Sequence, residues 1–268
     1  MNREDMIKEL TAKDRYDFDD LVTVMKLLRG EGGCPWDREQ THVSIRNNLI
    51  EETYEVIEAI DTENPELLRE ELGDVLLQVV FHAEIAEEEK QFVMGDVTTE
   101  ICQKLIHRHP HIFADVNVAN SDEVLKNWEA IKSDEKSRKT VTDKLTAIPH
   151  MLPALMRASK VGKKASCFDF PDTESVMDKI SEELVEVSEA IDGGNREEIF
   201  EEIGDLLLSV TSLCRKVGVD AEEALTRATD KFIDRFQKVE TEVIAQNKQI
   251  SECSIGELDA IWDKIKKK

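Results

Sequence analysis

The chain has 268 residues, of which 35% are charged and only 5% are aromatic, with 11 glycines and 6 prolines. This composition favours long amphipathic helices, so we expect an all-α protein, and the length allows two domains that each bury a core. The formal net charge of −23 repels a phosphate backbone and disfavours a nucleic acid polymer as a partner.

The N-terminal stretch MNREDMIKEL is charged from its second residue and has no apolar run of signal-peptide length. No later segment approaches the ~18 uninterrupted apolar residues of a membrane span. We therefore expect a cytoplasmic protein that has no membrane partner. Five scattered cysteines without a C-x-x-C spacing predict reduced, mostly buried thiols.

The first predicted hairpin begins with an apolar stripe that runs from Leu49 to Ile60 at helical spacing. The segment DTENP breaks this helix, and a second helix is expected from about Pro65 to Gln91. Short breaks of this kind join antiparallel neighbours. The two helices are therefore predicted to form the central hairpin of a small helical bundle.

The same hairpin occurs again 131 residues later in the chain. Residues 49–79 and 180–210 align without a gap and are identical at 17 of 31 positions. A period of this length does not fit a solenoid, so it predicts two homologous domains in tandem. We expect an N-terminal domain over residues 1–132, a polar linker with two prolines over 133–150 and a C-terminal domain over 151–268.

Each repeat carries two acidic residues at i, i+3 on each of its two helices. On the first helix of the N-terminal copy, Glu52 borders the apolar stripe, whereas Glu51 and Glu58 fall opposite it. On the second helix, Glu71 and Asp74 share a narrow polar stripe between apolar faces. The complete sets are Glu52, Glu55, Glu71 and Asp74 in the first copy and Glu183, Glu186, Glu202 and Asp205 in the second.

A single acidic stripe is most often a solvated helix face. Four carboxylates that converge at one level of a bundle are costly unless a cation neutralises them, and the duplication retains all four. Hard oxygen ligands favour Mg²⁺, with Mn²⁺ as a possible substitute. A di-iron site requires two E-x-x-H pairs, and only Glu39 and His42 have this spacing, so iron is disfavoured.

Basic residues lie near both acidic hairpins. They are candidates for contacts to a metal-bound phosphate, although a solvated helix face explains any one of them equally well. Trp128 and Trp262 recur in similar contexts, where a core anchor is more common than a stacking surface for a base. The candidate substrate-binding residues of the C-terminal domain are Lys163, Lys164, Lys231, Arg235, Lys238 and Trp262.

Together these motifs resemble the MazG family of nucleoside triphosphate pyrophosphohydrolases. EETYE followed by EELGD, and EELVE followed by EEIGD, are similar to the EExxE and ExxD signatures of that family. GCPWDREQTH and RHPHIFADV are similar to further stretches of its two-domain bacterial members. The resemblance runs from about residue 18 to the C-terminus.

The resemblance implies an all-α homodimer that hydrolyses NTPs or dNTPs to the monophosphate and pyrophosphate with Mg²⁺. Both acidic sets would be metal ligands, and the C-terminal set would be the catalytic one, as in similar two-domain proteins. Lys231 and Arg235 would neutralise phosphate oxygens while water attacks directly. Two alternatives stay open, namely a narrower pyrophosphatase for deoxynucleotides or damaged nucleotides and a non-catalytic helical adaptor.

Overall fold

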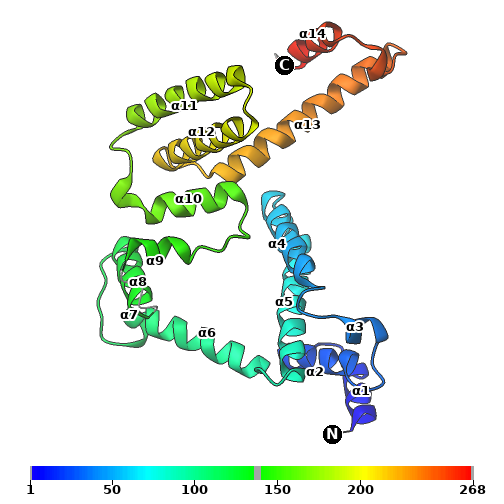
Figure 1. The fold of residues 1–268 in the computed structure, drawn as a ribbon. Coiled ribbons are helices and arrows are strands. Elements are labelled where there is room, and N and C mark those ends of the chain that lie inside the picture. Colours follow the sequence, from blue (N-terminus) through cyan, green and yellow to red (C-terminus); the bar gives the residue numbers. More distant parts are fainter. Residues whose placement is uncertain (1, 136–139, 267–268) are drawn as a thin grey trace. The chain divides into compact units, whose positions relative to one another are not determined.

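The structure is a computed structural model that describes residues 2–135 and 140–266. Every regular element in these two ranges is helical, which confirms the predicted fold class (Figure 1). The chain divides into two compact units, Met1–Lys132 and Ser133–Lys268. None of the helices in the described ranges combines the length and the apolar character that crossing a membrane requires.

In the first unit, a buried core joins helix α2 to the C-terminal half of helix α5. It consists of Met25, Ile45, Val80, Phe81 and Ile85, and partly buried apolar side chains surround it. The α5 residues of this core lie C-terminal to Glu71 and Asp74. The helices that begin in the first unit are α1 (Arg3–Thr11), α2 (Phe18–Arg29), α3 (Pro35–Glu39), α4 (Arg46–Asp61), α5 (Pro65–Glu88), α6 (Met94–Arg108), α7 (Pro110–Phe113) and α8 (Ser121–Glu135).

Arg29 fixes the end of α2 against α5. Its guanidinium donates to both carboxylate oxygens of Glu88, at 2.9 and 2.7 Å, and lies 5.2 Å from the ring centroid of Phe81. Arg29 is buried, so the two-fold hydrogen bond and the aromatic face offset the loss of its hydration. This ion pair anchors the C-terminal end of α5 to the end of α2.

In the second unit, the buried cluster lies between helices α13 and α14 and contains Val239, Val243 and Ile261. The first turn of α13 is joined to α10, because the Glu222 carboxylate accepts a hydrogen bond from the Met156 N–H at 3.2 Å. The elements of this unit are α9 (Val141–Thr146), α10 (Ala154–Lys164), η1 (Ser166–Phe168), α11 (Thr173–Gly193), α12 (Arg196–Lys216), α13 (Ala221–Ala245), η2 (Ile250–Glu252) and α14 (Ile255–Lys266).

The two predicted hairpins are α4–α5 and α11–α12, and local capping explains their ends. Asn64 and Asn195 are the N-caps of α5 and α12, and their side-chain oxygens accept from the backbone N–H groups that begin each helix. The turns differ at one equivalent position. Gly194 has a φ of 69°, whereas Glu63 has a φ of 51°, a left-handed conformation that costs free energy in a residue with a Cβ.

The apolar stripe of the first predicted helix faces a core within its own unit only in part. Leu49 and Val56 are partly buried, whereas Ile57 and Ile60 are 44% and 55% exposed. In the second hairpin, Leu184 and Leu207 are 54% and 50% exposed. The expectation of a core-facing stripe is therefore wrong for the exposed part of the stripe in the single chain. The reason is that α4 packs mainly on α5 and α11 on α12, so each described hairpin supplies two helices of a bundle and leaves an apolar face uncovered.

The segment predicted to be a linker, residues 133–150, contains the end of α8 and the whole of α9. Its residues 136–139 lie outside the described part of the chain. Helix α9 begins in a capping box, because the Thr140 hydroxyl accepts from the Asp143 N–H at 3.0 Å and the Asp143 carboxylate accepts from the Thr140 N–H at 2.9 Å. This reciprocal pair explains how a short polar segment starts a helix.

The prediction of mostly buried thiols is wrong. All five cysteines are free, Cys102 and Cys167 are exposed, and the other three are only partly buried. The two buried clusters are small and consist mainly of aliphatic side chains, so most cysteines fall outside them.

Candidate functional site

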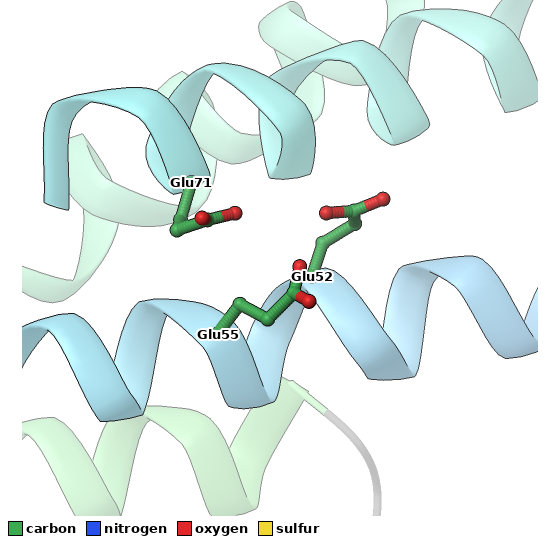
Figure 2. A group of neighbouring side chains, drawn as sticks. All are labelled: Glu52, Glu55 and Glu71. Carbon is green, nitrogen blue, oxygen red and sulfur yellow. The ribbon is translucent and has the colours of Figure 1, made fainter. Parts of the chain in front are cut away.

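The hairpin of the first unit brings three acidic side chains together. Glu52 and Glu55 lie one turn apart on α4, and Glu71 projects from α5, so the three carboxylates meet between the two helices (Figure 2). One oxygen from each residue lies within 4.8 Å of the others. Asp74, the fourth predicted member, is not part of this group.

The hairpin of the second unit repeats the arrangement with Glu183 and Glu186 on α11 and Glu202 on α12. Their oxygens also lie within 4.8 Å of one another, and Asp205, the equivalent of Asp74, again lies outside the group. We call Glu52, Glu55 and Glu71 the N-terminal triad and Glu183, Glu186 and Glu202 the C-terminal triad.

The carboxylates of each triad disfavour one another's charge. Burial, followed by repulsion from Glu55 and Asp74, raises the pKa of Glu71. Burial, followed by the hydrogen bond that protonated Glu52 donates to Glu55, raises the pKa of Glu52. In the second unit, burial and then repulsion from Glu183 and other acids raise the pKa of Glu202. Raised carboxyl pKa values are expected where acids converge in a place that is partly shielded from water.

The side chains that are present fit a hard divalent cation. Glu183 is only 3% exposed, and its buried Oε2 atom has no hydrogen-bond partner among the described residues. A buried carboxylate oxygen without a partner is costly, and a cation would satisfy it. In the described part of the chain, the groups of three or more neighbouring ligand-type side chains consist of glutamates alone, which favours Mg²⁺ or Mn²⁺ over softer metals.

Lys179 forms ion pairs with the C-terminal triad and is not among the residues predicted from the sequence. Its Nζ atom lies 2.8 Å from an oxygen of Glu182, 2.8 Å from Oε1 of Glu183 and 3.9 Å from an oxygen of Glu186. Hydrogen bonds to Glu182 and Glu183 raise the pKa of Lys179 above its usual range. The sequence contains a sign of this contact, because Lys179 lies four residues before Glu183 and side chains at i, i+4 are neighbours on a helix.

A cavity of about 730 Å³ lies beside the C-terminal triad. Its polar lining consists of Asp169, Lys179, Glu183, Asp205, Ser209, Ser212 and Arg215. Other parts of the wall are apolar and come from the α10 end, the η1 segment and the loop that follows it. A cavity that joins charged groups to an apolar wall suits a ligand with an anionic end and a less polar end.

Arg215 and Asp169 form a two-fold ion pair in the wall of this cavity. The guanidinium of Arg215 donates to both oxygens of Asp169, at 2.6 and 2.7 Å, and Lys216 lies 3.1 Å from the same carboxylate. These hydrogen bonds hold the pKa of Asp169 well below its usual range. The pair fastens the segment before α11 to α12, so it fixes the wall beside the triad.

The other predicted cationic residues do not belong to the lining of this cavity. Lys231, Arg235 and Lys238 lie on α13, where Lys238 pairs with Asp234 at 2.6 Å, and Lys163 and Lys164 lie at the end of α10. None of these five lines the cavity beside the triad in the described part of the chain. Trp262 belongs to the cluster between α13 and α14, and its ring centroid is 5.2 Å from that of Phe232.

His42 contacts a residue that the sequence did not reveal as its neighbour. Its Nδ1 atom lies 2.8 Å from Nδ1 of His82 on α5, and the two rings are stacked with centroids 5.1 Å apart. Burial, followed by the proximity of His42, lowers the pKa of His82. The pair is therefore a contact between two imidazoles, in which a neutral tautomer provides the acceptor.

Comparison with known proteins decides the family of this chain. The MazG nucleotide pyrophosphohydrolase domain matches residues 40–113 and again residues 172–240. The chain belongs to the MazG family. The two MazG matches contain the α4–α5 and α11–α12 hairpins with both triads, and the second extends along α13 through Lys231, Arg235 and Lys238.

Several MazG relatives are similar along most of their length. The nucleoside triphosphate pyrophosphohydrolase/pyrophosphatase MazG of Thermotoga maritima is 46% identical over 251 residues, which cover 93% of this chain and 95% of the relative. The nucleoside triphosphate pyrophosphohydrolase of Escherichia coli K12 is 43% identical over 258 residues, 93% of this chain and 97% of the relative. The similarity therefore includes both units.

Proposed function

We propose that this chain is a metal-dependent nucleoside triphosphate pyrophosphohydrolase that releases a nucleoside monophosphate and pyrophosphate from NTPs or dNTPs. The observation that carries the proposal is the triad of hard oxygen ligands in which the buried Oε2 of Glu183 has no hydrogen-bond partner among the described residues. Membership of the MazG family and the names of the bacterial relatives support the reaction.

In the proposed site, Glu183, Glu186 and Glu202 hold the metal, and Asp205 on the next turn of α12 completes the set. Bound Mg²⁺ supplies charge neutralisation at the phosphates and a lower pKa for an attacking water. The same role in the N-terminal unit falls to Glu52, Glu55, Glu71 and Asp74. Mn²⁺ is a possible substitute because it prefers the same ligands.

The chain's own cations bind the anionic substrate in this proposal. Lys231, Arg235 and Lys238 form a basic stripe on α13, and Lys163 and Lys164 end α10. Guanidinium and ammonium groups bind phosphate oxygens through charge-assisted hydrogen bonds. We assign these five residues to the triphosphate and Trp262 to the base or its surroundings.

The proposed division of labour assigns the main reaction to the C-terminal domain, residues 151–268, and a weaker or regulatory role to the N-terminal domain, residues 1–132. Residues 133–150 connect the two. The large cavity beside the C-terminal triad supports this division, because it offers the space that a nucleotide requires.

A homodimer is the proposed assembly, and the uncovered hairpin faces support it. On α11, Met177, Leu184 and Ile191 recur every seven residues and are each about half exposed, and Ile203 and Leu207 extend the apolar face along α12. Two such hairpins form a four-helix bundle when their apolar faces meet. In such a dimer, the α13 cations of one subunit would be able to contact a phosphate that is bound at the triad of the other subunit.

The reaction is tested by ion-exchange chromatography of the products after incubation of the purified chain with Mg²⁺ and each of the eight common NTPs and dNTPs. Monophosphate with pyrophosphate is expected, and EDTA should abolish the products. Diphosphate with phosphate, or no turnover across the panel, would contradict the proposal. The relative rates also distinguish a broad enzyme from a narrow deoxynucleotide pyrophosphatase.

The assembly is tested by light scattering on a size-exclusion column. The parent chain should elute with twice the mass of one chain, and Leu207→Asp should shift it toward the mass of one chain. Glu189→Gln, an exposed change on α11, is the control and should leave the mass unchanged.

The proposed reaction belongs in the cytoplasm, where nucleotides are abundant and free thiols stay reduced.

A further inference from the structure

The two triads differ in one neighbouring charge. Lys179 lies one turn before Glu183 on α11, and its ammonium contacts two of the three C-terminal carboxylates, at 2.8 Å from Glu183 and 3.9 Å from Glu186. Two thirds of its side chain is covered. A protein cation thus lies beside the oxygens that a divalent metal requires.

The equivalent position in the first unit is Asn48, four residues before Glu52 and 131 residues before Lys179. Asn48 has no charge. Among the residues that the structure describes, no lysine or arginine forms an ion pair with Glu52, Glu55 or Glu71. Within residues 2–135 and 140–266, the equivalent three acids therefore have a paired lysine in one unit and no paired lysine or arginine in the other.

An ammonium and a divalent cation cannot share these oxygens without repulsion. Two unit positive charges about 4 Å apart repel by several kcal/mol at the dielectric constant that is typical near a protein surface. A metal at the C-terminal triad therefore favours movement of the Lys179 ammonium away from Glu183. The lysine side chain has four flexible methylene groups, so this movement requires no change in helix α11.

The structure offers a place for the displaced ammonium. Lys179 already lines the cavity of about 730 Å³ together with Glu183, Asp205, Ser209 and Arg215. Arg215 already donates from both terminal nitrogens to Asp169, so its charge is paired with that carboxylate. A triphosphate in this cavity would present its oxygens beside the metal, within the region that the Lys179 side chain lines.

We propose that Lys179 is an exchangeable cation of the C-terminal site: it neutralises Glu183 when no metal is bound and contacts a substrate phosphate once a metal has displaced it. The inference rests on the proposed function, because it assumes a divalent cation and an anionic nucleotide. It explains why metal and nucleotide would strengthen each other's binding at the C-terminal site. The metal releases the Lys179 ammonium from Glu183 for a phosphate, and the phosphate holds the ammonium away from the oxygens that the metal requires. Asn48 gives the N-terminal site no such coupling.

The test compares Lys179→Asn, which copies Asn48, with the parent in the full chain. Both carry Glu52→Gln and Glu71→Gln, which remove the N-terminal ligands. Calorimetric titration with Mn²⁺ alone should show about tenfold tighter binding in Lys179→Asn, because the competing charge is gone. With saturating Mn²⁺, a non-hydrolysable α,β-methylene triphosphate should bind about tenfold more weakly, because a charge-assisted hydrogen bond is lost.

The opposite directions of these two effects separate the exchange from a merely structural role. A lysine that only stabilises helix α11 through i, i+4 pairing would leave both affinities unchanged or weaken both. Lys248→Asn is the matched control, because Lys248 pairs with Glu257 at 2.8 Å in the same unit and its loss changes the net charge equally. Lys248→Asn should change neither the affinity for Mn²⁺ nor the affinity for the triphosphate analogue.

The reciprocal variant provides an independent reading. Asn48→Lys, in a chain that carries Glu183→Gln and Glu202→Gln, should weaken Mn²⁺ binding at the N-terminal triad about tenfold. Mn²⁺ binding that is unchanged in both Lys179→Asn and Asn48→Lys would overturn the exchange and leave the metal site standing. Absence of any Mn²⁺ binding in the parent backgrounds would overturn the proposed metal site and the exchange together.

Discussion

The α4–α5 and α11–α12 hairpins carry the same acids in different surroundings. In the first, Arg29 and Glu88 fasten the far end of the hairpin to α2, and the triad has no paired cation within the described residues. In the second, Lys179 enters the triad and a large cavity opens beside it. The duplication thus preserved a ligand set while the groups that would bind the rest of a substrate diverged.

This difference teaches that the acids define where a metal can bind, whereas the neighbouring side chains decide what else can bind there. A hard cation needs only converging oxygens. A nucleotide also needs space, counter-charges and an apolar wall. Changes made in matched pairs, one in each unit, can therefore separate the two requirements.

The largest expected effect comes from removing each acidic set in turn. Glu183→Gln with Glu202→Gln should lower NTP hydrolysis at least ~100-fold, the size of a lost electrostatic stabiliser in an active site. Glu52→Gln with Glu71→Gln should lower it by less than about threefold if the C-terminal domain carries the reaction. Initial rates of pyrophosphate release measure both, with Glu189→Gln as the control. Equal losses in the two double variants would contradict the proposed division.

The next effect concerns the ion pairs that fasten the hairpins. Asp169→Asn should lower the free energy of unfolding by about 2 kcal/mol, because Arg215 loses one of its two acceptors and the negative charge of its partner at a site that is mostly covered. Glu88→Gln should cost about 1 kcal/mol, because the Glu88 side chain is 40% exposed and partly screened. Hydrogen exchange should show lost protection only in the unit that carries each change. A loss in both units would show that they do not unfold separately.

The acids also predict how the metal-free protein depends on pH. Because the pKa values of Glu71 and Glu202 are raised above 4.5, the folded state binds more protons than the unfolded state just above that pH. Stability should therefore fall as the pH rises from about 4.5 through the raised pKa values, and saturating Mg²⁺ should reverse this fall. Thermal midpoints in EDTA and in Mg²⁺ measure it, and Glu71→Gln with Glu202→Gln should flatten the EDTA curve. A pH dependence in EDTA that is the same in the parent and in this double variant would contradict the raised pKa values, because carboxyls with lowered pKa values, such as Glu257, contribute equally to both chains.

The smallest effect distinguishes the two hairpin turns. Glu63→Gly should stabilise the first unit by about 0.5 to 1 kcal/mol, because glycine adopts the left-handed conformation without the cost that Glu63 incurs. Gly194→Ala should destabilise the second unit by about 1 kcal/mol for the same reason, although space is available for the methyl group. Gly193→Ala, inside the last turn of α11, is the control and should be neutral or stabilising. Denaturant midpoints measure all three.

The sequence by itself determined the helical class, the two hairpins and the family. These follow from local spacing: residues three and four apart share a helix face, and asparagine caps and short breaks mark the ends of α5 and α12. The repeated acids also follow from spacing, so the hypothesis of two acidic sets needed no coordinates.

Only the tertiary structure decided which of these residues meet. It joined three acids of each set and left Asp74 and Asp205 outside the groups. It also placed Lys179 among the C-terminal carboxylates and left part of the predicted core-facing stripe exposed. The reason is that helical periodicity fixes the face of one helix, whereas the rotation and register of one helix against another depend on side-chain packing between distant segments. Covering the remaining apolar face requires contacts that a single hairpin does not contain.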